Sequence, residues 1–183
     1  MIRPLGRPGD LGWVVMAHGE LYAQEFGWDA SFERLVARIV ADYAERDGGD
    51  GDHDANGDAA WIAELDGARV GCVFCVAADE PGAAQLRILL VHPDARGHGL
   101  GGALVDTAVR FARGAGYERI RLWTNHPLAS ARHVYLSRGF ELVDEQRHHS
   151  FGVDLIGQTY ALELVPGKAT SADRLRVGRD SLG

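Results

Sequence analysis

The stretch RGHGLGG, from Arg96 to Gly102, decides how this chain is organised. It follows an apolar run, LRILLV, at residues 86–91, and it precedes ALVDTAVRFA at 103–112, whose apolar residues have helical spacing. The pattern predicts a buried strand, a glycine-rich turn and then a helix. In such a turn backbone N–H groups point at an anion, the helix dipole favours negative charge, and glycine lets the chain approach a phosphate closely. The stretch therefore predicts a phosphate-binding site.

Three kinds of phosphate site use glycines in this arrangement. A Walker A loop ends in Gly-Lys followed by Ser or Thr, which Gly101-Gly102-Ala103 does not supply, so that kind is excluded. A dinucleotide fold matches the glycine spacing but needs an acidic residue at the end of the next strand, which here ends in Trp-Thr-Asn. The third kind, an R-x-x-G-x-G site for the diphosphate of coenzyme A, fits residues 96–101.

Length and charge narrow the class of protein. The 183 residues suit one domain, which we expect at 1–165, followed by a disordered polar tail at 166–183. A net charge of -7 disfavours sequence-independent binding to nucleic acid. The sequence contains no apolar run of the about 20 residues that a membrane helix needs, and its first ten residues do not resemble a signal peptide. We therefore expect no nucleic-acid or membrane partner and a cytoplasmic location.

Two segments contain part of a metal-binding motif, but each lacks the remaining ligands. Cys72 and Cys75 form a C-x-x-C, but a zinc site needs four ligands, and two residues three apart on a strand face opposite ways. The acidic loop 45–58 contains the opening of a calcium loop, whose closing glutamate is replaced by Ala63. We therefore predict two core cysteines, a solvated acidic loop and no metal.

Hydrophobic periodicity and turn residues predict the remaining elements, with Asp10 and Asp29 as caps of the first two helices. The strand that ends near residue 91 is expected to be buried on both faces at that end. The predicted elements are a strand at 2–5, helices at 11–23 and 32–43, a hairpin at 61–76 turning at Asp66-Gly67, a strand at 84–91, a helix at 103–116, a strand at 119–124, a helix at 128–138, and strands at 140–145 and 158–164.

These elements and motifs resemble the GCN5-related N-acetyltransferase (GNAT) family over roughly residues 2–164. The resemblance is carried by HPDARGHGLG at 92–101 and by YLSRGF at 135–140, in their order along the chain. It implies an α/β (α+β) fold, with a mixed, mostly antiparallel central sheet flanked by helices and a V-shaped splay between its two central strands. LWTNHPLASARHVY and HHSFGVDLIGQTYALEL further resemble the acetyltransferase half of MarR–GNAT fusion proteins.

The resemblance also implies which residues hold acetyl-CoA as cosubstrate. The loop would bind the diphosphate, and the backbone at the end of the preceding strand would face the thioester carbonyl, whose oxygen becomes negative in the transition state. Asn125 either contacts coenzyme A, in place of a family asparagine that is Leu128 here, or caps the turn before Pro127. The implied cofactor-binding residues are Leu89, Leu90, Val91, Arg96, Gly97, His98, Gly99, Leu100, Gly101, Gly102 and Asn125.

The reaction itself needs an acid and a base. Tyr135 occupies the family's acid position, and a phenol with a pKa of about 10 suits a leaving thiolate whose thiol has a pKa of about 8.5. Two positions where relatives carry a glutamate base are Gln85 and Trp123 here. The remaining candidates for the base are Glu20, Glu25, His148, His149 or a chain of water molecules. We read the two histidines as part of a loop.

The expected function is acetyl transfer from acetyl-CoA to a primary amine. A small-molecule acceptor is favoured over a protein amine because aromatic residues, such as those in ELYAQEFGW at 20–28, are frequent in the acceptor region. The missing glutamates favour the alternative of a non-catalytic acyl-CoA-binding or sensor domain, against which Tyr135 argues. A homodimer is compatible with either reading.

Overall fold

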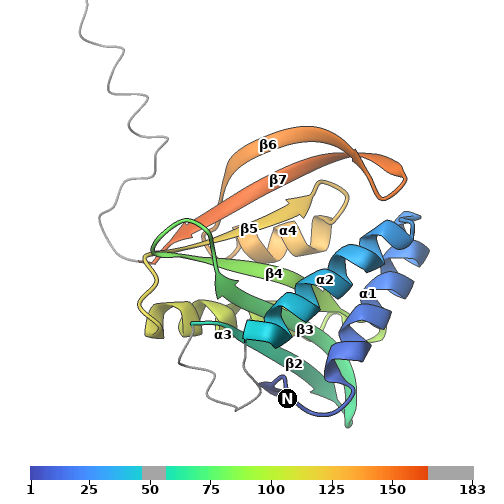
Figure 1. Cartoon of the computed structure of the whole chain (residues 1–183), viewed down its shortest axis with the longest axis horizontal. Coiled ribbons are helices and arrows are strands. Elements are labelled where there is room, and N and C mark those ends of the chain that lie inside the picture. The colour runs from blue at the N-terminus through green and yellow to red at the C-terminus, as the bar shows by residue number, and fades with distance from the viewer. Residues whose placement is uncertain (47–56, 165–183) are drawn as a thin grey trace, which may run out of the picture.

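The chain is built around one seven-stranded sheet with the order β1-β2-β3-β4-β5-β7-β6 (Figure 1). The computed structural model describes residues 1–46 and 57–164, so most of the acidic loop and the predicted tail lie outside the described residues. The strands are β1 (Ile2–Pro4), β2 (Ala59–Leu65), β3 (Ala68–Ala77), β4 (Ala83–Val91), β5 (Arg119–Asn125), β6 (Glu141–Ser150) and β7 (Val153–Glu163). Neighbouring strands are antiparallel except for β4 and β5, which confirms the predicted mixed sheet.

The two parallel strands separate soon after they meet. β4 and β5 pair only where Ala83–Leu86 face Arg119–Leu122. Beyond that point β4 follows β3 and β5 follows β7, which confirms the predicted V-shaped splay. Ile88 lies in this region with a φ of 44°, an unusual value for a β-branched residue, and the register between β3 and β4 shifts beside it. The end of β4 is only partly buried, contrary to our prediction, because the splay removes its neighbour on one side.

Helices cover both faces of the sheet and divide the core into two clusters (Figure 1). The pair α1 (Asp10–Phe26) and α2 (Ala30–Arg46) packs on one face, and α3 (Leu100–Gly114) with α4 (Ala129–Leu136) packs on the other. Cys72 belongs to the first cluster and Cys75 to the second, and both thiols are free and buried. The prediction of two core cysteines on opposite faces is therefore confirmed.

The first two helices begin in different ways. Asp29 caps α2 as predicted, since its carboxylate accepts the backbone N–H of Ser31 at 2.8 Å. Asp10, in contrast, is the first residue of α1, and Gly9 is the N-cap. The Asp10 carboxylate is fully buried and accepts hydrogen bonds from Arg3 at 2.7 and 2.9 Å and from Arg69 at 2.7 Å. It therefore joins α1 to β1 and β3 as well as accepting the amide of Arg7 at 2.9 Å.

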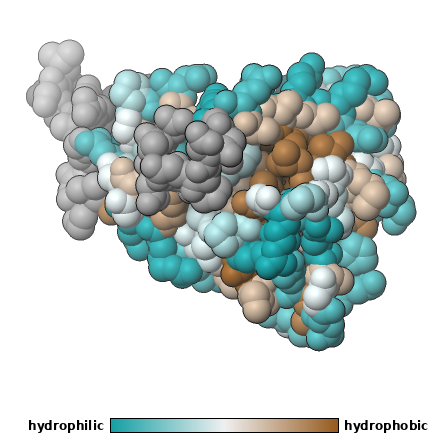
Figure 2. Space-filling model, turned by 60° about the horizontal axis from the view of Figure 1, so that its bottom comes forward, coloured by the Kyte–Doolittle hydropathy of each residue, from teal (hydrophilic) through white to brown (hydrophobic). Residues whose placement is uncertain are grey.

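The face of the molecule shown in Figure 2 is mostly hydrophilic. Figure 2 shows one area where hydrophobic side chains gather, with hydrophilic residues around it. Among the helices of residues 1–46 and 57–164, none combines the length and the apolar character needed to cross a membrane.

Candidate functional site

A groove with a volume of about 770 Å³ opens where β4 leaves β5. Its walls are the end of β4, the glycine-rich loop, the last turns of α1 and the start of α4. All of the predicted cofactor-binding residues line it except His98 and Asn125. The Nδ1 atom of His98 lies 3.1 Å from the carbonyl oxygen of Arg96, within its own loop. The groove therefore collects residues from β4, the loop and α3 on one surface.

Unpaired backbone amides face this groove at the start of α3. Gly99 is the N-cap with a φ of 71°, a left-handed conformation that glycine adopts without steric cost. Within the described part of the chain, the amides of Leu100, Gly101 and Gly102 donate no backbone hydrogen bond, and the first such bond of the helix is that of Ala103 to Gly99. The helix dipole adds partial positive charge at the same place. This end of α3 can therefore bind an anion such as a diphosphate.

Arg96 ties the loop to α1. Its guanidinium donates to both carboxylate oxygens of Glu25, at 2.6 and 3.0 Å, and to the carbonyl oxygen of Val91 at 3.2 Å. Arg96 and Glu25 both line the groove, and neither lines the smaller cavity described next. Glu25, one of the predicted bases, is thus held in an ion pair at the loop, which no local sequence signal indicates because 71 positions separate the two residues.

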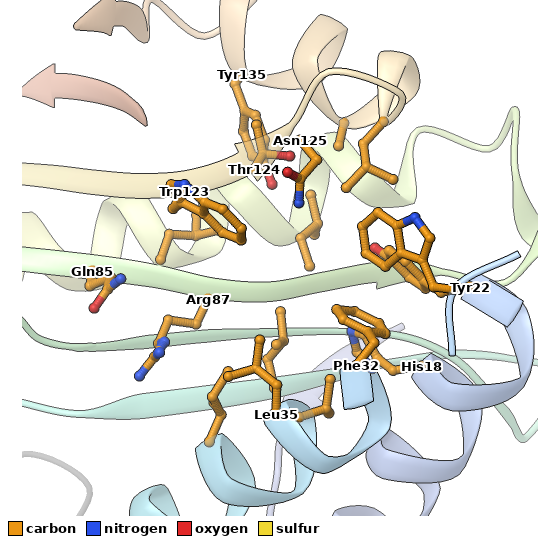
Figure 3. A pocket seen from close by; sticks show the side chains of 18 residues that line it. His18, Tyr22, Phe32, Leu35, Gln85, Arg87, Trp123, Thr124, Asn125 and Tyr135 are labelled. Atoms are coloured by element: carbon orange, nitrogen blue, oxygen red, sulfur yellow. The ribbon is translucent and has the colours of Figure 1, made fainter. Parts of the chain in front are cut away.

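A smaller cavity of about 120 Å³ lies between β4 and β5, beneath α1 and α2 (Figure 3). It shares Tyr22, Leu89, Leu128 and Ala131 with the groove, so the two hollows meet at these residues. Aromatic and aliphatic side chains form most of its wall. In Figure 3, Gln85 and Arg87 lie at one end of the cavity and Tyr22 at the other.

Tyr135 lines this cavity from α4, across from Phe32 and Leu35 (Figure 3). Its side chain is 4% exposed, and its hydroxyl makes no hydrogen bond to any residue in the described ranges. Burial raises the pKa of Tyr135 above its usual value, because a phenolate would be poorly solvated here. The hydroxyl therefore stays protonated at ordinary pH and is available as a donor.

Asn125 and His148 form a polar network beside the cavity, whose wall includes Asn125 and not His148. Asn125 is buried at the end of β5 and lines the cavity, whereas the prediction places it on the cofactor. His148 Nε2 lies 2.9 Å from Asn125 Oδ1, and His148 Nδ1 lies 2.9 Å from the hydroxyl of Ser150. Our prediction of a histidine loop is wrong, because both histidines belong to β6, which pairs with β7.

The other two candidate bases, like His148, line neither hollow. Glu20 is exposed on α1 and lines neither the groove nor the cavity. His149 points to the opposite side of β6 from His148, as neighbours on a strand do, and its ring lies 2.7 Å from Asp154.

His18, which the sequence analysis does not single out, is the buried titratable group of the cavity wall. It is 1% exposed and lies on α1 beside Tyr22 and Phe32. Nδ1 lies 2.8 Å from the carbonyl oxygen of Val14, so this nitrogen carries the proton of the neutral ring, while Nε2 has no hydrogen-bond partner among the residues described. Burial lowers the pKa of His18 to about 4, and the carbonyl groups of Val14 and Ile88 offset only part of this.

The lowered pKa of His18 predicts a pH dependence of stability. Between pH 6.5 and 4 the unfolded chain binds a proton that the folded chain does not, so the free energy of unfolding should fall by about 3 kcal/mol as the pH drops through this window. Above pH 6.5 this contribution is complete. Urea unfolding at several pH values measures the free energy of unfolding, and its dependence on pH should be weaker in His18→Leu. The same dependence in that variant and in native protein would show that other groups cause it.

Arg87 is the second residue that sequence reasoning missed. It lies two positions after Gln85 on β4 and lines the cavity with a partly buried side chain. Strand alternation puts Gln85, Arg87 and Leu89 on one face of an ideal strand, but only the splay shows that this face borders a cavity.

Comparisons with known proteins agree with this architecture. Residues 19–140 match the family described as "Acetyltransferase (GNAT) family". Human N-acetyltransferase 8B is 34% identical over 97 residues, and the match covers 51% of this chain and 43% of that protein. An uncharacterized N-acetyltransferase of Schizosaccharomyces pombe is 28% identical over 145 residues, covering 78% and 83% of the two chains.

Solved structures share the fold at lower identity. The protein yncA of Salmonella typhimurium, solved with its cofactor acetyl-CoA, superposes with a TM-score of 0.70 at 18% identity, covering 94% of this chain and 98% of that one. An N-acetyltransferase of Staphylococcus aureus gives a TM-score of 0.72 at 15% identity, covering 90% and 98%.

Proposed function

The chain belongs to the GNAT acetyltransferase family, and from this premise we propose that it transfers the acetyl group of acetyl-CoA directly to a primary amine. The observation that carries the proposal is the meeting of the two hollows. A groove with unpaired amides at one end opens, at Tyr22, Leu89, Leu128 and Ala131, into a cavity that contains a buried phenol. One hollow suits a long anionic cosubstrate and the other a small acceptor.

In this proposal the groove holds the cosubstrate. The amides of Leu100, Gly101 and Gly102 bind the diphosphate, and Arg96, fixed by Glu25, stands at the rim with a cationic side chain. The thioester then lies along the end of β4. The backbone of residues 87–91 pairs with β3 but has no strand partner on the β5 side, so an amide that points to that side can stabilise the oxygen that becomes negative as the amine attacks.

The reaction takes place where the hollows meet. The amine nitrogen forms a bond to the thioester carbon, the carbon–sulfur bond breaks, and Tyr135 donates its hydroxyl proton to the departing sulfur. The amine must also lose a proton, for which Glu20 and Glu25 remain predictions. A chain of water molecules is the other predicted route for this proton, and neither glutamate lines the cavity.

The acceptor is proposed to be a small molecule, since the cavity measures about 120 Å³ and is walled mostly by apolar side chains. The likeness to MarR–GNAT fusion proteins, the cytoplasmic location and the homodimer remain predictions. They do not affect the chemistry of the site.

Two measurements test the proposed function. Calorimetry should detect binding of acetyl-CoA to the native protein, and a panel of primary amines should release free coenzyme A thiol. Binding together with turnover supports the enzyme. Binding with no turnover on any amine would instead favour the non-catalytic acyl-CoA-binding alternative. If acetyl-CoA does not bind, both functions are excluded.

Gly101 offers a direct test of the groove. It lies between Val91 and Val134, each 3.6 Å from where a Cβ would stand, so a larger side chain fits the backbone but enters the groove. We expect Gly101→Leu to weaken acetyl-CoA binding by at least about tenfold while α3 stays folded, because leucine has a higher helix propensity than glycine. Calorimetry measures the affinity.

The control is Gly114→Leu at the other end of α3, where a Cβ would meet nothing within 4 Å. It should leave the affinity for acetyl-CoA unchanged. Equal affinities in the two variants would place the cosubstrate away from the loop.

A further inference from the structure

The described wall of the cavity contains one positively charged side chain and no negatively charged one. Of the described side chains that line it, Arg87 is the only one that carries a charge at neutral pH, because His18 is neutral and neither Asp nor Glu contributes to the wall. A cavity without a carboxylate offers nothing to attract a second ammonium group. This disfavours polyamines as acceptors and leaves a cation available to an anionic group.

Arg87 also lacks the partner that comparable arginines have. The partly buried Arg69, Arg119 and Arg138 each form an ion pair of 2.7 Å with an aspartate or glutamate. Arg87 makes no ion pair and no hydrogen bond within residues 1–46 and 57–164. Burial lowers the pKa of Arg87, the charges of Asp42 and Asp79 oppose this, and the charge of Arg46 adds to it. A half-buried guanidinium in this state binds an incoming carboxylate strongly, since the pair would be charge-assisted and bidentate.

The position of Arg87 limits the size of such a ligand. Leu89, where the cavity meets the groove, is two residues further along β4, which separates the two backbone positions by about 7 Å at most, because the chain is not fully extended at Ile88. In Figure 3, Arg87 and Gln85 lie at the end of the cavity away from Tyr22. A molecule that reaches from Arg87 to the thioester therefore has its amine only a few bonds from its anionic group.

We propose that the acceptor is a small amino carboxylate whose carboxylate is bound by Arg87 while its amine faces the end of the groove. The proposal rests on the proposed function and narrows its substrate class. Gln85, on the same side of β4, is placed to donate a hydrogen bond from its carboxamide to the same carboxylate. The apolar wall, including Phe32, Leu35 and Trp123, contacts the carbon skeleton between the two ends.

The kinetic test compares matched acceptors. Amino acids are assayed beside their carboxamides and beside the amines that lack the carboxylate, with native protein, Arg87→Gln, Arg87→Lys and Arg113→Gln. Native protein should prefer the amino acid in kcat/KM. Arg87→Gln should raise KM for the amino acid by about 10- to 100-fold, the value of a charge-assisted pair, and leave KM for acetyl-CoA unchanged.

The variants separate charge from geometry. Arg87→Lys should recover part of the lost affinity, because it keeps the charge and loses the planar fork. Arg113→Gln removes an exposed arginine at the end of α3, far from the cavity lining, and should behave as native protein. Two outcomes would overturn the proposal. In one, native protein acetylates the amine that lacks the carboxylate as well as it acetylates the amino acid. In the other, Arg87→Gln slows the reaction of both acceptors equally.

A binding measurement keeps this inference distinct from the proposed function. Calorimetry of N-acetyl amino acids against protein saturated with coenzyme A should show binding that Arg87→Gln loses, whether or not turnover occurs. Such binding without turnover in any assay would refute the proposed function and support the carboxylate site. Turnover of amines with no binding of any carboxylate would support the proposed function and refute the carboxylate site.

Discussion

Replacing Tyr135 by phenylalanine should lower kcat by about 10²- to 10⁴-fold, the usual contribution of a general acid. The substitution removes one hydroxyl, which makes no hydrogen bond to the described residues, and it keeps the ring that packs against Phe140 and Tyr160. The fold and the affinity for acetyl-CoA should therefore be unchanged. Thiol release at saturating substrate measures kcat, and calorimetry measures the affinity.

Tyr160→Phe is the matched control, because it removes the hydroxyl of a neighbouring buried tyrosine that bonds to Gln158 and lines neither hollow. Its kcat should stay near the native value. Since burial raises the pKa of Tyr135 above its usual value, the native rate should not fall through ionisation of this phenol up to about pH 10. A Tyr135→Phe protein with native kcat would show that the thiolate leaves without help from this residue.

Replacing Asp10 by alanine should lower the free energy of unfolding by about 3–5 kcal/mol, the cost of breaking a buried ion pair from one side. Asp10 is fully buried and Arg3 is 8% exposed, so Arg3 would lose its main buried counter-charge, although Glu64 still contacts it at 2.7 Å. The substitution also frees Arg69 and leaves the amides of Gly6 and Arg7 without their acceptor. Urea unfolding at pH 7 measures the loss.

A double variant tests the cause. Arg3→Met in the Asp10→Ala background should restore part of the lost stability, because it removes a buried cation that has lost its main counter-charge. Burial alone would raise the pKa of Asp10, but the hydrogen bonds from Arg3 and Arg69 outweigh it and lower the pKa below its usual value. Its contribution is therefore complete above the unfolded pKa of about 3.9 and is lost only as the pH falls below that. A loss under about 1 kcal/mol for Asp10→Ala would mean that solvent reaches these arginines.

Local sequence was sufficient where one segment determines its own conformation. The order of residues around Arg96–Gly102 predicted the succession of strand, glycine-rich turn and helix, although α3 begins at Leu100, three residues before the predicted start. The two-residue alternation placed Cys72 and Cys75 on opposite faces, and Asp29 was identified as a cap from its neighbours alone. These predictions depend on backbone periodicity and on residues within one turn of each other, and such information is contained in a short window.

Other features depended on elements that meet only in the folded chain. The first half of β6 was predicted as a strand at 140–145. Its second half, which contains His148 and His149, is polar and has no apolar alternation, and there the pairing with β7 makes it a strand. Local patterns fail in the second half of β6 because hydrogen bonds to a neighbouring strand decide its conformation.

The chain by itself thus determined the succession of elements around the glycine-rich loop and the family. Only the tertiary structure decided what surrounds each functional group: that Glu25 is held by Arg96, that Asn125 contacts His148, and that Arg87 lies half-buried beside a cavity without a described counter-ion. The physical reason is that charge, burial and access to solvent are properties of the space around a side chain. That space is formed by segments far apart in sequence, whereas periodicity and turn chemistry act between neighbours.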